Sequence, residues 1–265
     1  MSSTAWKGID KDTSSTRIKY GPGAPMSEHA QKAVQFDDFT SIPVTAGDIP
    51  YGWSGYKGSD GAAAYPTVPG GQAAVGSAVL NGVARLVTGA GAGASLAANG
   101  SRLESGRAFR VSTGGLVMEA RLKVPSTVTN LHLFVGLTGS VGSLVTPATL
   151  GASDALTAVA TNAVGFLYDT AADTDYWWGI GINASSGSKA NLGVAPSGSF
   201  FYILRIEVDT SGNTSYFIDG KKLGYLAAAI DPTVGQIAPA VVAFSRTIAS
   251  KTVDVFYFHV EGDRI

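Results

Sequence analysis

The stretch that decides the fold is Leu116-Val-Met-Glu-Ala-Arg-Leu-Lys-Val124, in which apolar and charged side chains alternate. Successive side chains of a β-strand point to opposite faces, so this alternation predicts a strand with one buried and one solvated face. The buried face is expected to carry Leu116, Met118, Ala120, Leu122 and Val124. The solvated face is expected to carry Val117, Glu119, Arg121 and Lys123.

Strand signals of the same kind continue along the chain. They predict strands over residues 131–137, 163–168, 176–182, 200–208, 214–218, 221–226, 239–246 and 252–261. Asn81-Gly82 and Asp219-Gly220 predict hairpin turns, and short helices are expected from Ser27 and over residues 153–162. Roughly a dozen short strands joined by turns predict an all-β fold, an antiparallel two-sheet jelly-roll sandwich.

The composition supports this fold class and excludes several functions. Gly supplies 34 of the 265 residues, about 13%, where about 7% is usual. Charged residues make up only 15% of the chain, where about 25% is usual. A net charge of −1 argues against a nucleic-acid partner, and the absence of cysteine removes disulfides and Cys-ligated metals. No apolar run reaches the roughly 18 to 20 residues of a membrane span, and no secretory signal follows Met1. We therefore expect neither a nucleic-acid nor a membrane partner.

Local composition divides the chain into three parts. Residues 1–40 are polar, contain the breaker run Gly21-Pro-Gly-Ala-Pro25, and are predicted to form an extended N-terminal arm. Residues 41–74 are rich in Pro and Gly and are predicted to be a loop-rich connection, so residues 75–265 would form the sandwich. Because a polar arm cannot build a core of its own, contact with its own domain or with a neighbouring subunit would have to order it.

The C-terminal half resembles a known family. The run FYILRIEVD over 201–209, then Gly212-Asn213, then Tyr216-Phe-Ile-Asp-Gly-Lys221, is similar to the concanavalin A-like lectin/glucanase sandwich, including laminin-G-like modules. The segments GFLYD (165–169) and DYWW (175–178) look like those of bacteriophage virion proteins that carry this sandwich. The resemblance covers about residues 75–265 and implies a jelly roll. This fold hosts enzymes, lectins and structural parts alike, so individual residues have to indicate the function.

The sequence offers no pair of catalytic carboxylates. Retaining glucanases of this fold need two carboxylates about 5 to 5.5 Å apart, which the family writes as E-x-D-x-x-E on one strand. The nearest match has Arg121 and Lys123 after Glu119, where further carboxylates belong. We therefore interpret Glu119 as a partner of basic residues on the solvated face, and predict no catalytic residues and no enzyme. The three histidines lack zinc-site spacing, so no cofactor is expected.

An acidic loop is a candidate for binding a cation. Asp169, Asp173 and Asp175 supply carboxylate oxygens, which Ca²⁺ prefers as ligands. Their spacing fits no compact calcium loop, and Asp is common in plain turns. We therefore predict no metal site and retain these three residues as weak candidates.

A cluster of aromatic residues is a candidate for binding a glycan or a protein. Trp177 and Trp178 are adjacent on a predicted strand, so their rings should lie on opposite faces of the sheet. One exposed ring beside Tyr176 could stack on a sugar or anchor a protein partner. The alternative is that both rings are buried between the sheet and a loop.

These observations lead to one favoured functional prediction and one alternative. The favoured prediction is a non-enzymatic bacteriophage virion protein, a capsid decoration or cement protein that binds copies of itself, the major capsid protein or tail components. Its arm would supply the contacts through Trp6, Lys7, Arg17, Lys19 and Tyr20. The alternative is a tail or fibre protein that binds a host-surface glycan through Tyr176, Trp177 and Trp178. Both hypotheses place the protein in the virion.

Overall fold

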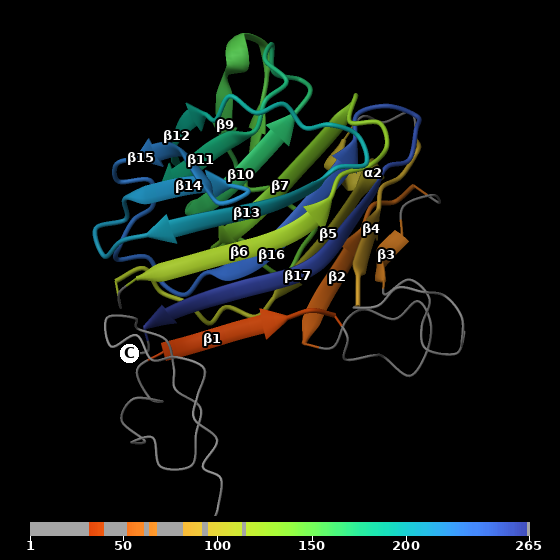
Figure 1. The fold of residues 1–265 in the computed structure, drawn as a ribbon. Coiled ribbons are helices and arrows are strands. Elements are labelled where there is room, and N and C mark those ends of the chain that lie inside the picture. The colour runs from red at the N-terminus through yellow and green to blue at the C-terminus, as the bar shows by residue number, and fades with distance from the viewer. Residues whose placement is uncertain are drawn as a thin grey trace, which may run out of the picture.

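The computed structural model describes residues 32–39, 52–60, 64–67, 82–91, 95–112 and 115–263. Within these ranges, strands dominate and form two large antiparallel sheets, with one small hairpin outside them (Figure 1). The predicted all-β sandwich is confirmed. The helical elements described are α2 (Leu96–Asn99) and the 3-10 turn η1 (Ala152–Asp154). Neither of them is long and apolar enough to cross a membrane.

The first sheet, sheet A, contains eight strands. Its order is β15 (Lys221–Leu226), β14 (Thr214–Ile218), β13 (Phe201–Val208), β6 (Leu116–Lys123), β17 (Thr252–Asp263), β4 (Ala84–Val87) and β3 (Ala64–Thr67), and β1 (Lys32–Asp37) also pairs with β17. The 12-residue strand β17 pairs with β6 on one side. On its other side it pairs first with β4 and then, further along, with β1.

The second sheet, sheet B, contains seven strands. Its order is β12 (Ser186–Asn191), β11 (Trp178–Asn183), β10 (Ala163–Asp169), β7 (Leu131–Thr138), β16 (Ala238–Ser245), β5 (Gly100–Ser105) and β2 (Trp53–Lys57). The small hairpin outside the two sheets consists of β8 (Ala148–Leu150) and β9 (Leu156–Ala158). Because neighbouring strands in both sheets come from distant parts of the chain, the topology is that of a jelly roll.

The alternation at residues 116–124 places side chains as predicted. The even-numbered residues of β6 are fully buried between the sheets, whereas the odd-numbered ones lie on the outer face of sheet A. Burial of each large aliphatic side chain contributes about 1.5 to 3 kcal/mol before the conformational entropy cost is subtracted. This face of β6 is therefore a main contributor to the core.

Aromatic side chains fill the space between β10, β11 and β14. The ring of Phe166 meets Tyr216 edge-on at 5.6 Å between centroids and Trp177 at 6.5 Å. Tyr216, on sheet A, donates its hydroxyl proton to the carbonyl oxygen of Ile180 on sheet B at 2.7 Å. A buried polar atom on one sheet is thus satisfied by the other, which fixes how the two sheets face each other.

The sandwich contains strands from the segments that the sequence assigned to the arm and the connection. Of these, β1 lies within residues 1–40, and β2 and β3 lie within residues 41–74. The Asp37 carboxylate accepts hydrogen bonds from Trp53 Nε1 and from the Phe39 amide, both at 2.7 Å. Phe39 is fully buried, with its ring 5.5 Å from that of Trp53. These short strands show no regular apolar alternation, so only their pairing with distant strands reveals them.

The helix predicted over residues 153–162 is wrong. Ser153 and Asp154 adopt positive φ angles of 59° and 55°, which break a right-handed helix, and the residues after them form β9. Asp154 instead accepts hydrogen bonds from the Thr174 amide at 2.9 Å and the Thr174 hydroxyl at 3.0 Å. The helix predicted from Ser27 and the Asn81 side of the predicted hairpin lie outside the described residues.

Candidate functional site

The outer face of sheet B is covered by the β8–β9 hairpin (Figure 1, green). The hairpin contributes Ala148 and Leu150 to a second hydrophobic cluster that is separate from the core between the sheets. The sheet contributes Phe134, Ala163, Leu167, Trp178, Ile180, Ile182, Ala240 and Val242. Apolar side chains therefore fill the area between the hairpin and β10.

Asp169 lies at the end of β10 and is fully surrounded by hydrogen-bond donors. Its carboxylate accepts from Arg246 Nε at 2.6 Å and Arg246 Nη2 at 2.7 Å. It also pairs with His132 Nδ1 at 3.0 Å. The backbone amides of Leu150 and Ala171 donate to it at 3.0 and 3.2 Å. Both carboxylate oxygens are thus used within the protein.

His132 connects this carboxylate to the hairpin. Burial lowers the pKa of His132, so the ring is neutral, with Nδ1–H assigned as the donor to Asp169. Burial alone would raise the pKa of Asp169, but His132 and Arg246 outweigh it and hold that pKa well below its usual range. His132 Nε2 faces the Thr146 hydroxyl at 2.8 Å. An acid–imidazole–hydroxyl chain can activate a nucleophile, but this one is buried and anchors the hairpin to the sheet.

The three aromatic residues predicted to form a binding surface are separated. Trp177 lies in the core between the sheets and Trp178 lies under the β8–β9 hairpin, so the rings take opposite faces as expected. Both are buried, which is the alternative that the sequence left open. Lys189 Nζ covers the Trp178 ring at 4.5 Å from its centroid. Tyr176 is 37% exposed, and the two tryptophans that follow it in the chain are both buried.

The three aspartates of the acidic loop do not converge. Asp169 is buried and bound to Arg246, whereas Asp173 is exposed and accepts from the Ser153 amide at 2.9 Å. Burial, and next the charge of Asp169, raise the pKa of Asp175. In the part of the chain that the structure describes, no group of three or more His, Asp or Glu side chains could hold a metal ion.

Glu119 lies on the outer face of sheet A, as predicted from the alternation. One of its oxygens accepts the Tyr257 hydroxyl proton at 2.7 Å, and the other lies 3.9 Å from Arg205 Nη1. The contact with Arg205 agrees with the interpretation of Glu119 as a partner of basic residues. The predicted arm contacts Trp6, Lys7, Arg17, Lys19 and Tyr20 all lie outside the described residues.

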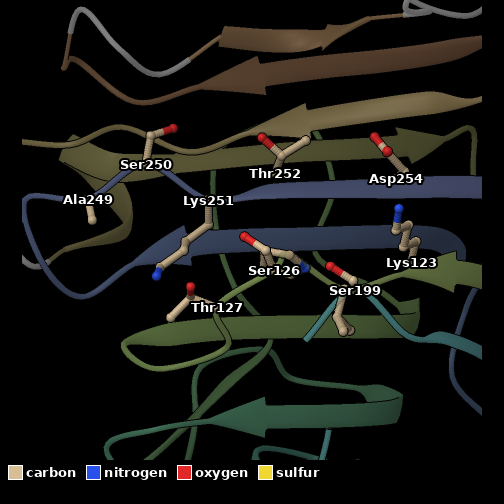
Figure 2. A pocket seen from close by; sticks show the side chains of 11 residues that line it. Lys123, Ser126, Thr127, Ser199, Ala249, Ser250, Lys251, Thr252 and Asp254 are labelled. Atoms are coloured by element: carbon tan, nitrogen blue, oxygen red, sulfur yellow. The ribbon is translucent and has the colours of Figure 1, made fainter. Parts of the chain in front are cut away.

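A polar pocket of about 380 Å³ lies at one end of the sandwich (Figure 2). We call it the Lys251 pocket. Its walls come from residues 123–127 at the end of β6, from Ser199 before β13, and from residues 249–252 and Asp254 at the start of β17. Hydroxyl groups dominate the lining: Ser126, Thr127, Ser199, Ser250 and Thr252. The charged lining residues are Lys123, Lys251 and Asp254.

Lys251 is the most unusual residue of this pocket, because its side chain is only 7% exposed. Its backbone pairs with Thr88, whose hydroxyl accepts the Lys251 amide proton at 2.8 Å. No hydrogen bond or ion pair to a described residue engages the ammonium group, and burial lowers its pKa. In Figure 2 the side chain leaves the chain next to Ser250 and extends into the pocket toward the side where Thr127 lies.

The other two charged lining residues do not neutralise Lys251. Both oxygens of Asp254 are taken by Arg85, whose Nε and Nη2 donate at 2.6 and 2.8 Å. Lys123 extends toward the Phe201 ring, with Nζ 5.6 Å from the ring centroid. The pocket therefore carries an excess of positive charge.

Exposed aromatic rings adjoin the pocket. Phe200 and Phe201 are 61% and 43% exposed. The Phe200 carbonyl accepts from the amide of Val124, a lining residue, at 3.2 Å, and Phe201 is the register partner of Lys123. Phe256 lies 5.1 Å from the Phe201 ring. Apolar ring faces thus border a pocket of hydroxyl and ammonium groups.

Sequence reasoning missed this pocket, because its walls come from three distant segments. One signal was available. Lys251 directly precedes β17, and in the alternation of that strand it falls on the same face as Val253 and Val255, which are fully buried. The alternation of the last strand therefore already placed a lysine on the inward face.

No protein-family model matches the sequence, and no curated protein matches it. Several solved structures share the fold. A glycoside hydrolase family 16 endo-glucanase from Bacteroides ovatus gives a TM-score of 0.55 at 12% identity, over 85% of this chain and 99% of that chain. A β-glucanase from Bacillus licheniformis gives 0.51 at 10% identity, over 86% and 97%. LamA from Z. galactanivorans, solved with laminaritriose and laminaritetraose, gives 0.53 at 13% identity, over 86% and 98%.

These neighbours contradict the functional predictions made from the sequence. They include proteins named as an endo-glucanase, a β-glucanase and a glycosidic hydrolase, and none of those named here is a virion component. The prediction of a non-enzymatic virion structural protein is therefore wrong, as a decoration protein and as a tail or fibre protein. The prediction that the chain is not an enzyme is contradicted by the same structures. The chain has the concanavalin A-like jelly-roll fold on which these glucanases are built.

Proposed function

We propose that the protein is glycan-active and that it binds its glycan at the Lys251 pocket and the adjoining rings of Phe200 and Phe201. The observation that carries the proposal is the combination of a hydroxyl-lined pocket with exposed aromatic faces at its edge. The fold comparison supports the same class of ligand, because the LamA structure contains laminaritriose and laminaritetraose.

The chemistry of a sugar ring explains why this combination matters. A sugar presents hydroxyl groups around its edge and apolar C–H groups on its faces. Serine and threonine hydroxyls both donate and accept, so the pocket can satisfy several sugar hydroxyls at once. Phe200 and the exposed part of Phe201 offer apolar ring surface that loses little conformational entropy on binding, and Arg121 and Lys123 lie over the remainder of the Phe201 ring. The volume of about 380 Å³ falls in the range of small-ligand sites.

The number of carboxylates in the pocket decides whether the pocket could hydrolyse a glycan. Hydrolysis with retention of configuration needs two carboxylates about 5 to 5.5 Å apart. Asp254 is the sole carboxylate among the lining residues, and it is bound to Arg85. The pocket is therefore assigned the binding of the glycan. A cleavage assay accompanies the binding test, because several neighbours of the fold are named as hydrolases.

Titration of the purified chain with a panel of soluble oligosaccharides tests the proposal by calorimetry. We expect saturable binding, and we expect Phe201→Ala to weaken it about fivefold or more, the equivalent of one substantial contact residue. Tyr225→Ala is the matched control, because Tyr225 is 54% exposed on β15, outside the pocket. The proposal fails if no oligosaccharide binds, or if both variants weaken binding equally. Newly formed reducing ends are measured in the same samples to detect cleavage.

A further inference from the structure

A largely buried lysine side chain without an ion pair is rare in a folded protein. Lysine is almost never fully buried unless it is paired, because removing its charge from water is costly. Lys251 is 7% exposed, yet no described residue forms a hydrogen bond or an ion pair with its ammonium group. The protein therefore holds a positive charge at the pocket wall that nothing in the described chain balances.

The surroundings of Lys251 leave it available to a ligand. Asp254 is the acidic residue of the lining, and Arg85 binds both of its oxygens. Ser250 donates its hydroxyl proton to the Thr88 carbonyl at 2.6 Å, so it is occupied as well. Ser126, Thr127 and Thr252 line the same pocket, and no described group takes their hydroxyl protons. These three hydroxyls are free to donate to a ligand in the pocket, and Thr127 lies on the side toward which the Lys251 side chain extends (Figure 2).

We infer that the glycan bound at the Lys251 pocket is acidic, and that a carboxylate or sulfate group on the sugar pairs with Lys251. This inference rests on the proposed glycan-binding function. Carboxylate and sulfate share the feature that matters here, which is a negatively charged group with several acceptor oxygens. An ammonium group and nearby hydroxyls recognise such a group through charge-assisted hydrogen bonds. The rest of the sugar would extend toward Phe200 and Phe201, which border the pocket.

Binding measurements on matched oligosaccharides test the inference. The probes are an oligogalacturonate, a sulfated galactan oligosaccharide, a neutral glucan oligosaccharide of equal length, and inorganic sulfate. We expect at least one acidic probe to bind about tenfold or more tightly than the neutral one, the size of one charge-assisted contact. Comparison of the two acidic probes distinguishes a carboxylate from a sulfate.

Substitutions of Lys251 separate its charge from its shape. Lys251→Met keeps an unbranched side chain and removes the charge, and we expect it to lose the preference for the acidic probe while still binding the neutral one. Lys251→Arg is expected to retain the preference. Lys222→Met is the matched control on exposed β15, and it should leave both affinities unchanged. Because Lys251→Met removes an unpaired charge from a largely buried side chain, its thermal midpoint without ligand should equal or exceed that of the unchanged protein.

Each outcome decides between the two proposals. Equal affinity for acidic and neutral probes, or a preference that survives in Lys251→Met, overturns the inference and leaves glycan binding intact. Binding of inorganic sulfate as tight as that of the acidic oligosaccharides also overturns it, because the sugar then contributes nothing. Failure of every oligosaccharide to bind removes the proposed function and the inference together.

Discussion

Asp169→Asn tests whether the buried ion pair under the hairpin stabilises the protein. The substitution keeps the size of the side chain but removes its charge and replaces one acceptor oxygen with a donor NH₂ group. That NH₂ group is a hydrogen-bond donor and would face other donors, because Arg246 donates two hydrogen bonds to this carboxylate and His132 donates a third. Removing one partner of a buried ion pair costs about 3 to 5 kcal/mol, because the other charge is left uncompensated.

The expected loss is large enough for ordinary denaturation experiments. A change of 1 kcal/mol moves the thermal midpoint by about 2 to 4 °C in a domain of this size, so we expect a decrease of roughly 6 to 20 °C. Urea unfolding should give the same loss at an unchanged slope. Asp173→Asn is the control, because Asp173 is exposed and accepts one backbone hydrogen bond, and we expect a change within about 0.5 kcal/mol.

Two further measurements refine the test. Hydrogen exchange at the Leu150 amide should become faster in Asp169→Asn, because that amide donates to the altered group. Adding Arg246→Met should recover part of the loss, since it removes the charge that Asn cannot balance. A loss below about 1 kcal/mol in Asp169→Asn, or an equal loss in Asp173→Asn, would refute the argument that this network carries stability.

The remaining predictions concern close packing and pH. Gly165→Ala should lower the free energy of unfolding by about 1 to 3 kcal/mol, because the added Cβ would lie 2.5 Å from the Val135 carbonyl oxygen. Urea unfolding measures this loss. Gly235→Ala is the control, because a Cβ at that position would meet no neighbour within 4 Å. Stability should fall as the pH drops below about 6.5, since burial lowers the pKa of His132 and the unfolded state takes up a proton first. A further fall is expected below about pH 4, because the pKa of Asp169 is held low in the folded state. Thermal midpoints measured from about pH 8 to about pH 3 check both, and a flat profile would contradict them.

Local patterns predicted most of the sandwich strands. The regular alternation in β6 identified its buried face because a period of two is a property of the strand itself. The two adjacent tryptophans were placed on opposite faces for the same reason. Strands β1, β2, β3 and β5 were missed, because their conformation depends on partners far away in the sequence. Strand β12, which pairs with its neighbour β11, was missed as well.

The candidate site was harder to predict than the fold. The helix expected over residues 153–162 had a suitable pattern, but Ser153 and Asp154 adopt left-handed backbone angles and form tertiary hydrogen bonds with Asp173 and Thr174. The Lys251 pocket is built from three segments, and no local pattern joins them. The β8–β9 hairpin covers Trp178 only in the folded protein, so this contact could not be predicted from a local pattern either.

The position of β17 has a consequence for the way this chain folds during synthesis. Residues 252–263 fill the middle of sheet A, where β6, β4 and β1 all require them as a hydrogen-bonding partner. During synthesis these residues are made after all the remaining described strands of both sheets. Until they emerge, the edges of β6, β4 and β1 that pair with β17 are open to other chains. The nascent sandwich therefore depends on β17 for its closure, and slow translation near residue 250 should increase aggregation.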